Sequence, residues 1–273
     1  MPSETNVLGD GLDTVVDAAL GSDADVVYVT GPTPALLESL VGLATDADGV
    51  PELRVLAPRK TLKTVTDEFL LASNAADLVE AGVLELRVTE DQTENALLVT
   101  EESVTAVVTL GDAAAGLVTT DAGFVRTAND ACRSAFEAGE RFTLRTPAIS
   151  AVRSSLEADL GAEVRADFDA VLDSVQEALP ADATLDEVTI SLLVAAKNEV
   201  LLYDVSKWGE DVGIASKATF SRTKSELEEA GVIATEKVPI DVGRPRLRLK
   251  LDDERLQAAS ANTLADVARD ILD

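Results

Sequence analysis

The sequence predicts two domains: an α/β domain built on an open, mostly parallel or mixed sheet with covering helices, and a smaller domain of three helices and a β-hairpin. Three observations support this expectation. The 273 residues fit about two domains of ordinary size. Strand and helix patterns alternate over the first 90 residues, which favours an open sheet. After Pro180, three helical segments precede two strictly alternating segments joined by a turn signal.

The first domain begins with alternating helices and strands. A β-branched segment before Gly31-Pro32 is typical of a buried strand, and Pro34 suits the start of the helix that follows. This order favours an open parallel or mixed sheet. We expect helices over residues 12–20, 35–44 and 58–81, and strands over residues 25–30, 53–56 and 83–88.

The pattern changes at residue 96. Three short strands over residues 97–100, 104–110 and 116–119 are separated by turn signals, and hairpins are the natural connection for such spacing. Residues 122–178 then predict two or three helices. We therefore expect the first domain to span residues 1–179.

The second domain opens with a capping box, Thr184-Leu-Asp-Glu187, at the start of its first helix. A short second helix over residues 203–212 breaks at Gly213, and a third helix over residues 216–230 stops at Gly231. Helix, short helix, glycine turn and helix is the order of a helix-turn-helix.

Two alternating strands follow the third helix. They cover residues 232–238 and 246–251 and flank a turn signal that ends at Arg244. The hairpin completes a winged helix-turn-helix over residues 180–251. Residues 252–273 predict an amphipathic helix, for which dimerisation and packing on its own domain are equally open.

Residues 213–233 resemble the recognition-helix block of prokaryotic winged-helix regulators. In that block a glycine precedes Ile-Ser, Ala-Thr-aliphatic-Ser-Arg and Leu-Glu-x-x-Gly, and the chain follows the pattern with two departures. An extra residue separates Ile214 from Ser216, and Lys224 replaces a leucine.

The whole chain resembles the haloarchaeal TbsP-type transcriptional regulators, which are linked to the sugar-responsive TrmB regulators. The resemblance implies a sequence-specific, DNA-binding regulator of central sugar metabolism. TrmB proteins place their DNA-binding domain first, whereas here it comes second. Their sugar-binding residues are therefore not carried over to this chain.

The third helix has one face suited to double-stranded DNA. At 100° per residue, Phe220, Lys224 and Leu227 share the inner face. The opposite face holds small side chains around Arg222, which can bond the O6 and N7 atoms of guanine in the major groove. The expected contacts are Ser216, Lys217, Ala218, Thr219, Ser221, Arg222 and Ser225.

Local charge supports this interpretation. Residues 213–250 carry eight basic and five acidic residues, a local charge of +3 in a chain of net charge −27. A basic hairpin in so acidic a protein predicts contact with phosphates or with the minor groove. The expected contacts are Lys237, Arg244, Arg246 and Arg248. The alternative is a helix-hairpin module that binds protein.

The overall charge is far from that of an ordinary soluble domain. Fifty acidic residues stand against 23 basic ones, whereas a net charge of about 2 to 8 is enough to keep a small domain in solution. This composition resembles that of haloarchaeal proteins, in which surface carboxylates suit a salt-rich cytoplasm. We interpret the acidic surface as a halophilic adaptation to the solvent.

The acidic surface predicts that the melting temperature rises with KCl concentration. Added salt screens the repulsion between carboxylates that the folded state holds close together. Thermal melts at low and at molar KCl measure the effect, and equal melting temperatures would contradict it.

Composition also excludes several classes of function. The absence of histidine removes Ser-His-Asp and Cys-His triads and His-based metal sites. A single cysteine, Cys132, forms neither an internal disulfide nor a thiolate zinc site. With no secretory segment and no apolar run of about 18 residues, we expect a soluble cytoplasmic protein without membrane contact. We also expect no metal, no cofactor and no enzymatic activity.

The first domain is expected to sense a small metabolite or to bind a partner. Its site is expected at the carboxyl edge of the first strands, where open sheets bind ligands and where three cations cluster in an acidic domain. The expected residues are Thr30, Gly31, Thr33, Arg59, Lys60 and Lys63. A solvated basic surface is the alternative for these cations. For the whole chain, the alternatives are a catalytic first domain or an adaptor whose winged helix mediates assembly.

Overall fold

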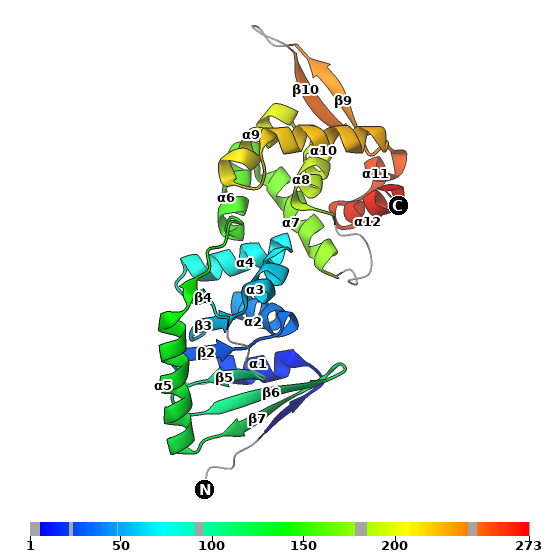
Figure 1. Ribbon diagram of the computed structural model, residues 1–273. Helices are drawn as coiled ribbons and strands as arrows, with labels where there is room; N and C mark the ends of the chain where they lie inside the picture. Colours follow the sequence, from blue (N-terminus) through cyan, green and yellow to red (C-terminus); the bar gives the residue numbers. More distant parts are fainter. Residues whose placement is uncertain are drawn as a thin grey trace. The chain divides into compact units, whose positions relative to one another are not determined.

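The computed structural model describes residues 6–21, 24–47, 49–90, 95–177, 185–239 and 245–272. The chain forms two compact units, residues 1–148 and 149–273, and each is described by itself (Figure 1). Within the described ranges, no helix combines the length and the apolar character that crossing a membrane requires.

The first unit is built on an eight-stranded mixed sheet of order β1-β7-β6-β5-β2-β3-β4-β8. Strands β2, β3 and β4 are parallel, and every other neighbouring pair is antiparallel. The sheet confirms the predicted fold class of this part of the chain. The strands are β1 (Val7–Gly9), β2 (Val26–Thr30), β3 (Glu52–Ala57), β4 (Leu84–Val88), β5 (Ala96–Val99), β6 (Val104–Leu110), β7 (Ala113–Thr119) and β8 (Glu140–Arg141).

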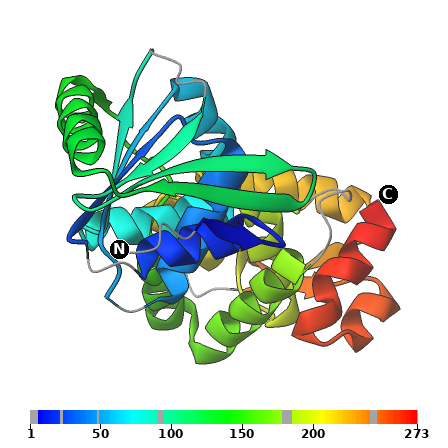
Figure 2. The ribbon, with the colours of Figure 1, turned by 90° about the horizontal axis from the view of Figure 1, so that it is seen from below.

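Helices cover both faces of this sheet (Figure 2). Four helices pack on one face and build the larger apolar core, and α5 packs on the other face. The helices are α1 (Leu12–Leu20), α2 (Pro34–Asp46), α3 (Arg59–Thr66), α4 (Phe69–Glu80) and α5 (Ala122–Ala138).

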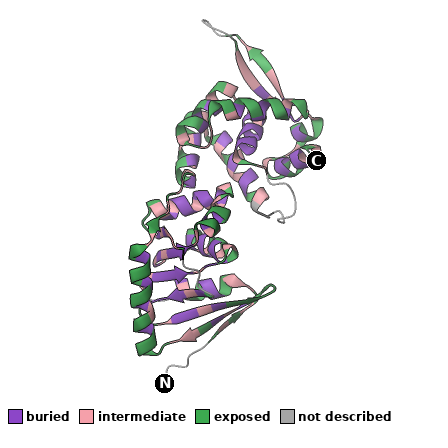
Figure 3. Ribbon diagram, in the orientation of Figure 1, coloured by how far each residue is buried: buried purple, intermediate pink, exposed green. Residues whose placement is uncertain are grey.

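The pleat of each strand divides its side chains between these two cores. In β2, Val27 and Val29 enter the larger core, while Tyr28 points to the α5 side. In the same way, β3 places Val55 in the larger core and Leu56 under α5. Figure 3 shows the resulting buried residues gathered on the central strands.

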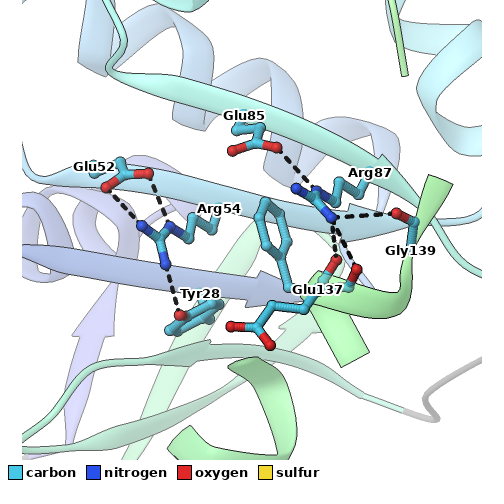
Figure 4. A network of polar contacts seen from close by, with 8 residues as sticks. Tyr28, Glu52, Arg54, Glu85, Arg87, Glu137 and Gly139 are labelled. Carbon is cyan, nitrogen blue, oxygen red and sulfur yellow. Dashed lines mark hydrogen bonds and ion pairs between the residues drawn. The ribbon is translucent and has the colours of Figure 1, made fainter. Parts of the chain in front are cut away.

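Two arginines fix the end of α5 to the sheet (Figure 4). Arg87 of β4 stacks on Phe136 with its guanidinium carbon 4.6 Å from the ring centroid, and it donates to the carbonyls of Phe136, Glu137 and Gly139 at 3.0–3.4 Å. These carbonyls lie at the C-terminal end of α5, where a cation is stabilising. Arg54, held by both carboxylate oxygens of Glu52, donates to the hydroxyl of Tyr28 at 2.9 Å.

Three details of this unit differ from the sequence prediction. The single helix expected over residues 58–81 is two helices, α3 and α4, separated at Asp67 and Glu68. Strands β1 and β8 were not expected, because segments of three and two residues carry too little alternation to indicate a strand.

The second unit is mainly helical and contains the predicted winged helix-turn-helix. Its α8 is buried all round from Val188 to Ala196, as expected of a central helix. The elements are α6 (Ile149–Leu160), α7 (Ala162–Glu177), α8 (Glu187–Lys197), α9 (Leu202–Val212), α10 (Lys217–Glu229), β9 (Ile233–Val238), β10 (Arg246–Leu251), α11 (Glu254–Ala258) and α12 (Ala261–Leu272).

Helices α6 and α7 belong to this second unit, whereas the sequence analysis extended the first domain to residue 179. Trp208 of α9 explains the grouping, because its indole N–H donates to Ser155 of α6 at 2.9 Å and its ring meets Phe168 of α7 edge-on. An amphipathic pattern shows that a helix has an apolar face, but it does not show which partner covers that face. The proposed boundary itself, residues 178–184, lies outside the described residues.

The last helix, α12, packs on α7 of its own unit. Leu264, Ala265 and Ala268 are fully buried there. Of the two interpretations left open for the C-terminal helix, the structure shows packing on its own unit.

Candidate nucleic-acid interface

The helix-turn-helix turn is built by a glycine and a serine. Gly213 ends α9 with a φ of 93°, a left-handed conformation that glycine adopts without strain. Ser216 then caps α10, since its hydroxyl accepts from the backbone N–H of Thr219 at 3.2 Å. The ion pair between Glu210 and Lys217, at 2.7 Å, joins the two helices across the turn.

The two helices approach closely. A Cβ atom on Gly209 would lie 2.3 Å from two ring carbons of Phe220, so the contact requires glycine. Phe220, Lys224 and Leu227 are buried on the inner face of α10, which confirms the predicted orientation of this helix.

The opposite face of α10 is free of packing. Its predicted contact residues are all exposed except Thr219, which is half-buried. Arg222 forms no ion pair with any residue that the structure describes. The helix therefore presents Arg222 among the short side chains of Ala218, Ser221 and Ser225. Ser216 and Lys217 are exposed at its start, where Lys217 pairs with Glu210.

The wing is the two-stranded hairpin β9–β10, whose register pairs Arg248 with Glu236 and Leu249 with Thr235. Alternation places Arg246, Arg248 and Lys250 on one face and the leucines of β10 on the other. The structure thus brings three cations into one row. Arg244 lies outside the described residues.

Each cation of this row has a carboxylate neighbour. Arg246 stacks on Tyr203 and lies 3.3 Å from Asp204 of α9. Arg248 lies 3.9 Å from Glu199, and Lys250 lies 2.7 Å from Glu236. Lys237 is exposed and has no ion-pair partner among the described residues.

Hydrogen bonds between these charged groups shift their pKa values. The bond to Glu210 raises the pKa of Lys217, and the same contact lowers the pKa of Glu210. The bond to Glu236 raises the pKa of Lys250. Each lysine therefore stays charged over the whole physiological pH range.

Lys224 is buried and forms its ion pair within the second unit. It is 9% exposed and pairs with Glu228 at 2.5 Å, while Thr235 of the wing donates to the same carboxylate at 2.7 Å. Burial raises the pKa of Glu228, but hydrogen bonds from Lys224 and Thr235 outweigh it and leave that pKa below its usual value. This network joins the wing to α10.

In the first unit, the two predicted loops lie at one edge of the sheet. Strands β2 and β3 are parallel neighbours, and Gly31 N–H donates to the carbonyl of Leu56 at 3.3 Å. Thr30 is buried, and the hydroxyl of Thr33 caps α2 by accepting from the N–H of Leu36. Both threonines therefore have structural roles in this loop.

Two of the three predicted cations line a cavity that the loop residues do not reach. Arg59 and Lys63 line a cavity of about 610 Å³, whereas Thr30, Gly31, Thr33 and Lys60 are not part of its wall. Two further cations that the sequence analysis missed, Arg141 and Arg145, line the same cavity. The sequence feature that could have indicated them is their spacing of four residues in the short segment between α5 and α6.

The described residues contain no group of three or more cysteine or carboxylate side chains placed to hold a metal ion. Cys132 lies on the buried face of α5, and burial raises the pKa of its thiol. A protonated thiol is a poor nucleophile.

Two family models match the chain and together cover almost all of it. One, described as Transcriptional regulator TbsP-like, N-terminal, matches residues 4–147. The other, described as Transcriptional regulator TbsP-like, C-terminal HTH domain, matches residues 148–269. Their junction lies within one residue of the division of the structure into two units. No curated protein matches the chain.

Two solved structures share a weak likeness with the chain. One is TrmBL2, an archaeal chromatin protein described as showing a novel mode of DNA binding, at 18% identity and a TM-score of 0.37, with 52% of this chain and 55% of that one covered. The other is Nuc, a phospholipase D family member from Salmonella typhimurium, at 11% identity and a TM-score of 0.36, with 50% and 97% covered. The chain thus spans about half the length of TrmBL2, and neither likeness is strong enough to assign a function.

Proposed function

Because the chain belongs to the TbsP-like transcriptional regulators, a family of regulators and not of enzymes, we propose that it reads an operator as a homodimer and controls genes of central sugar metabolism. We propose further that its first unit senses a small metabolite. The support for sugar-metabolism targets is the family resemblance.

One observation carries the proposed reading of DNA. The exposed face of α10 holds Arg222 among short side chains, so a base edge can approach the helix closely. The cations of the wing then contact the phosphate backbone, which sets the position of the helix but does not read sequence. Lys237, Arg244, Arg246 and Arg248 fill this second role.

Selection of bound fragments tests this function. The full chain is titrated against genomic DNA fragments at high KCl, and the retained fragments are sequenced. The proposal expects enrichment of a shared motif upstream of genes for sugar metabolism. Retention without any shared motif would contradict specific reading, and a motif upstream of unrelated genes would contradict the proposed targets.

The homodimer requires a surface where two acidic copies meet without repulsion. Leu8, Val108, Leu110 and Leu117 are 45–84% exposed, and the strand register places them on one face of β1, β7 and β6, beyond the part that α5 covers. None of the four is charged, in a chain of net charge −27. We propose that a second copy covers this face, since helix-turn-helix dimers bind two half-sites.

Changing one face of β6 tests the dimer. Leu110→Glu places a charge on the apolar face and is expected to give a monomer, as measured by light scattering after gel filtration. Thr109→Glu adds the same charge on the opposite face of the same strand and is expected to leave the dimer intact. A monomeric wild type, or a dimeric Leu110→Glu variant, would contradict the proposed interface.

A further inference from the structure

The cavity of the first unit lies between α3 and the segment that follows α5. Arg59, Lys63 and Thr66 are one turn apart on the same face of α3 and form one wall. Residues 140–146 form the other wall and contribute Arg141 and Arg145. The volume of about 610 Å³ is typical of a small-molecule site.

The charge of this cavity is opposite to that of the chain. Four cations and two carboxylates, Asp67 and Glu140, line it. Arg59 is paired with Glu140 at 2.7 Å. Lys63, Arg141 and Arg145 form no ion pair with any residue that the structure describes. Unpaired cations on two facing walls suit a small ligand with several negative charges.

The segment that carries two of these cations is held at both of its ends. At its start, Arg87 binds the last carbonyls of α5, and a Cβ on Gly139 would meet Leu56 at 2.9 Å and the carbonyl of Val88 at 3.1 Å. At its end, the fully buried Ser73 donates to the carbonyl of Pro147 at 2.5 Å. Two residues after Pro147 the chain enters α6, the first helix of the DNA-binding unit.

We propose that this cavity binds a phosphorylated metabolite, whose phosphate bridges α3 and residues 140–146. Arg59 and Lys63 hold the ligand from the helix, while Arg141 and Arg145 hold it from the segment. Because that segment continues into α6, ligand binding and DNA binding are coupled. This inference rests on the proposed function for its regulatory meaning, but the binding of the phosphate does not depend on DNA.

Calorimetry on the full chain without DNA tests the site. Fructose 1,6-bisphosphate and inorganic phosphate are the phosphate probes, citrate is a carboxylate probe of similar charge, and glucose is the neutral probe. We expect fructose 1,6-bisphosphate to bind most tightly and glucose not to bind. Absence of binding by both phosphate probes overturns the proposal, and equal binding of citrate overturns the assignment to phosphate.

Three variants that each remove one positive charge show where the ligand binds. Lys63→Gln and Arg145→Gln, one from each wall, are each expected to weaken binding of fructose 1,6-bisphosphate about tenfold. Arg126→Gln removes an exposed cation on α5 that does not line this cavity, and it is expected to bind as the wild type does. Equal affinity in all three variants overturns the proposed site. Thermal melts show that each variant is folded.

A separate DNA titration distinguishes the site from the function. We expect fructose 1,6-bisphosphate to change the affinity for a selected operator by about 5- to 150-fold, the usual range of coupling between two sites, and Arg145→Gln to reduce this change. If the ligand binds and operator affinity does not change, the coupling is wrong while the site stands. If no operator can be selected at all, the proposed function fails while the calorimetric result is unaffected.

Discussion

Trp208→Ala is expected to lower the free energy of unfolding of the second unit by about 3–5 kcal/mol. Trp208 is 2% exposed and joins three helices, because its ring meets Phe168 of α7 and its indole N–H reaches Ser155 of α6. Alanine leaves a cavity at this junction and removes the hydrogen bond to Ser155. Hydrogen exchange of α6, α7 and α9 measures the loss in the full chain.

Two further variants separate the contributions. Ser155→Ala keeps the Trp208 ring but removes the acceptor of its indole N–H, together with the bond from the serine hydroxyl to the carbonyl of Val152, and it is expected to cost about 1–3 kcal/mol. Phe124→Ala truncates an aromatic ring that is 56% exposed in the first unit, and it is expected to leave the protection of α6, α7 and α9 unchanged. Equal protection of these helices in Trp208→Ala and wild type would show that α6 and α7 are not held by α9.

Arg222→Ala is expected to lose about 1–3 kcal/mol of discrimination at one base position of the operator. Arg222 is the long hydrogen-bond donor of the outward face of α10, and its neighbours there are too short to replace it. Binding to operators with every single-base change measures the effect. Preference at one position is expected to relax while preference at the others remains.

Arg246→Ala is the contrasting variant, because its expected role is contact with phosphate. It is expected to weaken binding to all sequences by a similar factor and to preserve the order of preference. If Arg222→Ala keeps the full selectivity of the wild type, the proposed placement of α10 in the major groove is wrong.

The helix-turn-helix was predictable because each of its elements depends on local chemistry. Gly213 ends α9, Ser216 caps α10, and the spacing of Phe220 and Leu227 alone identifies the buried face. These signals lie within one or two helical turns of the feature they determine. A single sequence is sufficient to read them.

The cavity of the first unit was only half predictable. Arg59 and Lys63 follow a recognisable strand, so their place at the sheet edge was foreseeable. Arg141 and Arg145 reach the same cavity because β8 pairs with β4, a contact between residues more than 50 positions apart. Such a short edge strand has no pattern of its own, and the pairing depends on tertiary structure.

If the wing contacts DNA as proposed, its ion pairs make binding an exchange reaction. A phosphate that binds Arg246, Arg248 or Lys250 takes the place of a carboxylate from Asp204, Glu199 or Glu236. Each displaced carboxylate then lies beside DNA and attracts a cation from solution, while DNA releases its own condensed counterions. Ion uptake and release partly cancel, so operator affinity falls less steeply with salt than the roughly 0.9 logarithmic units per phosphate contact of a simple basic surface. We therefore expect an acidic regulator of this kind to lose less DNA affinity at high ionic strength than a basic regulator loses.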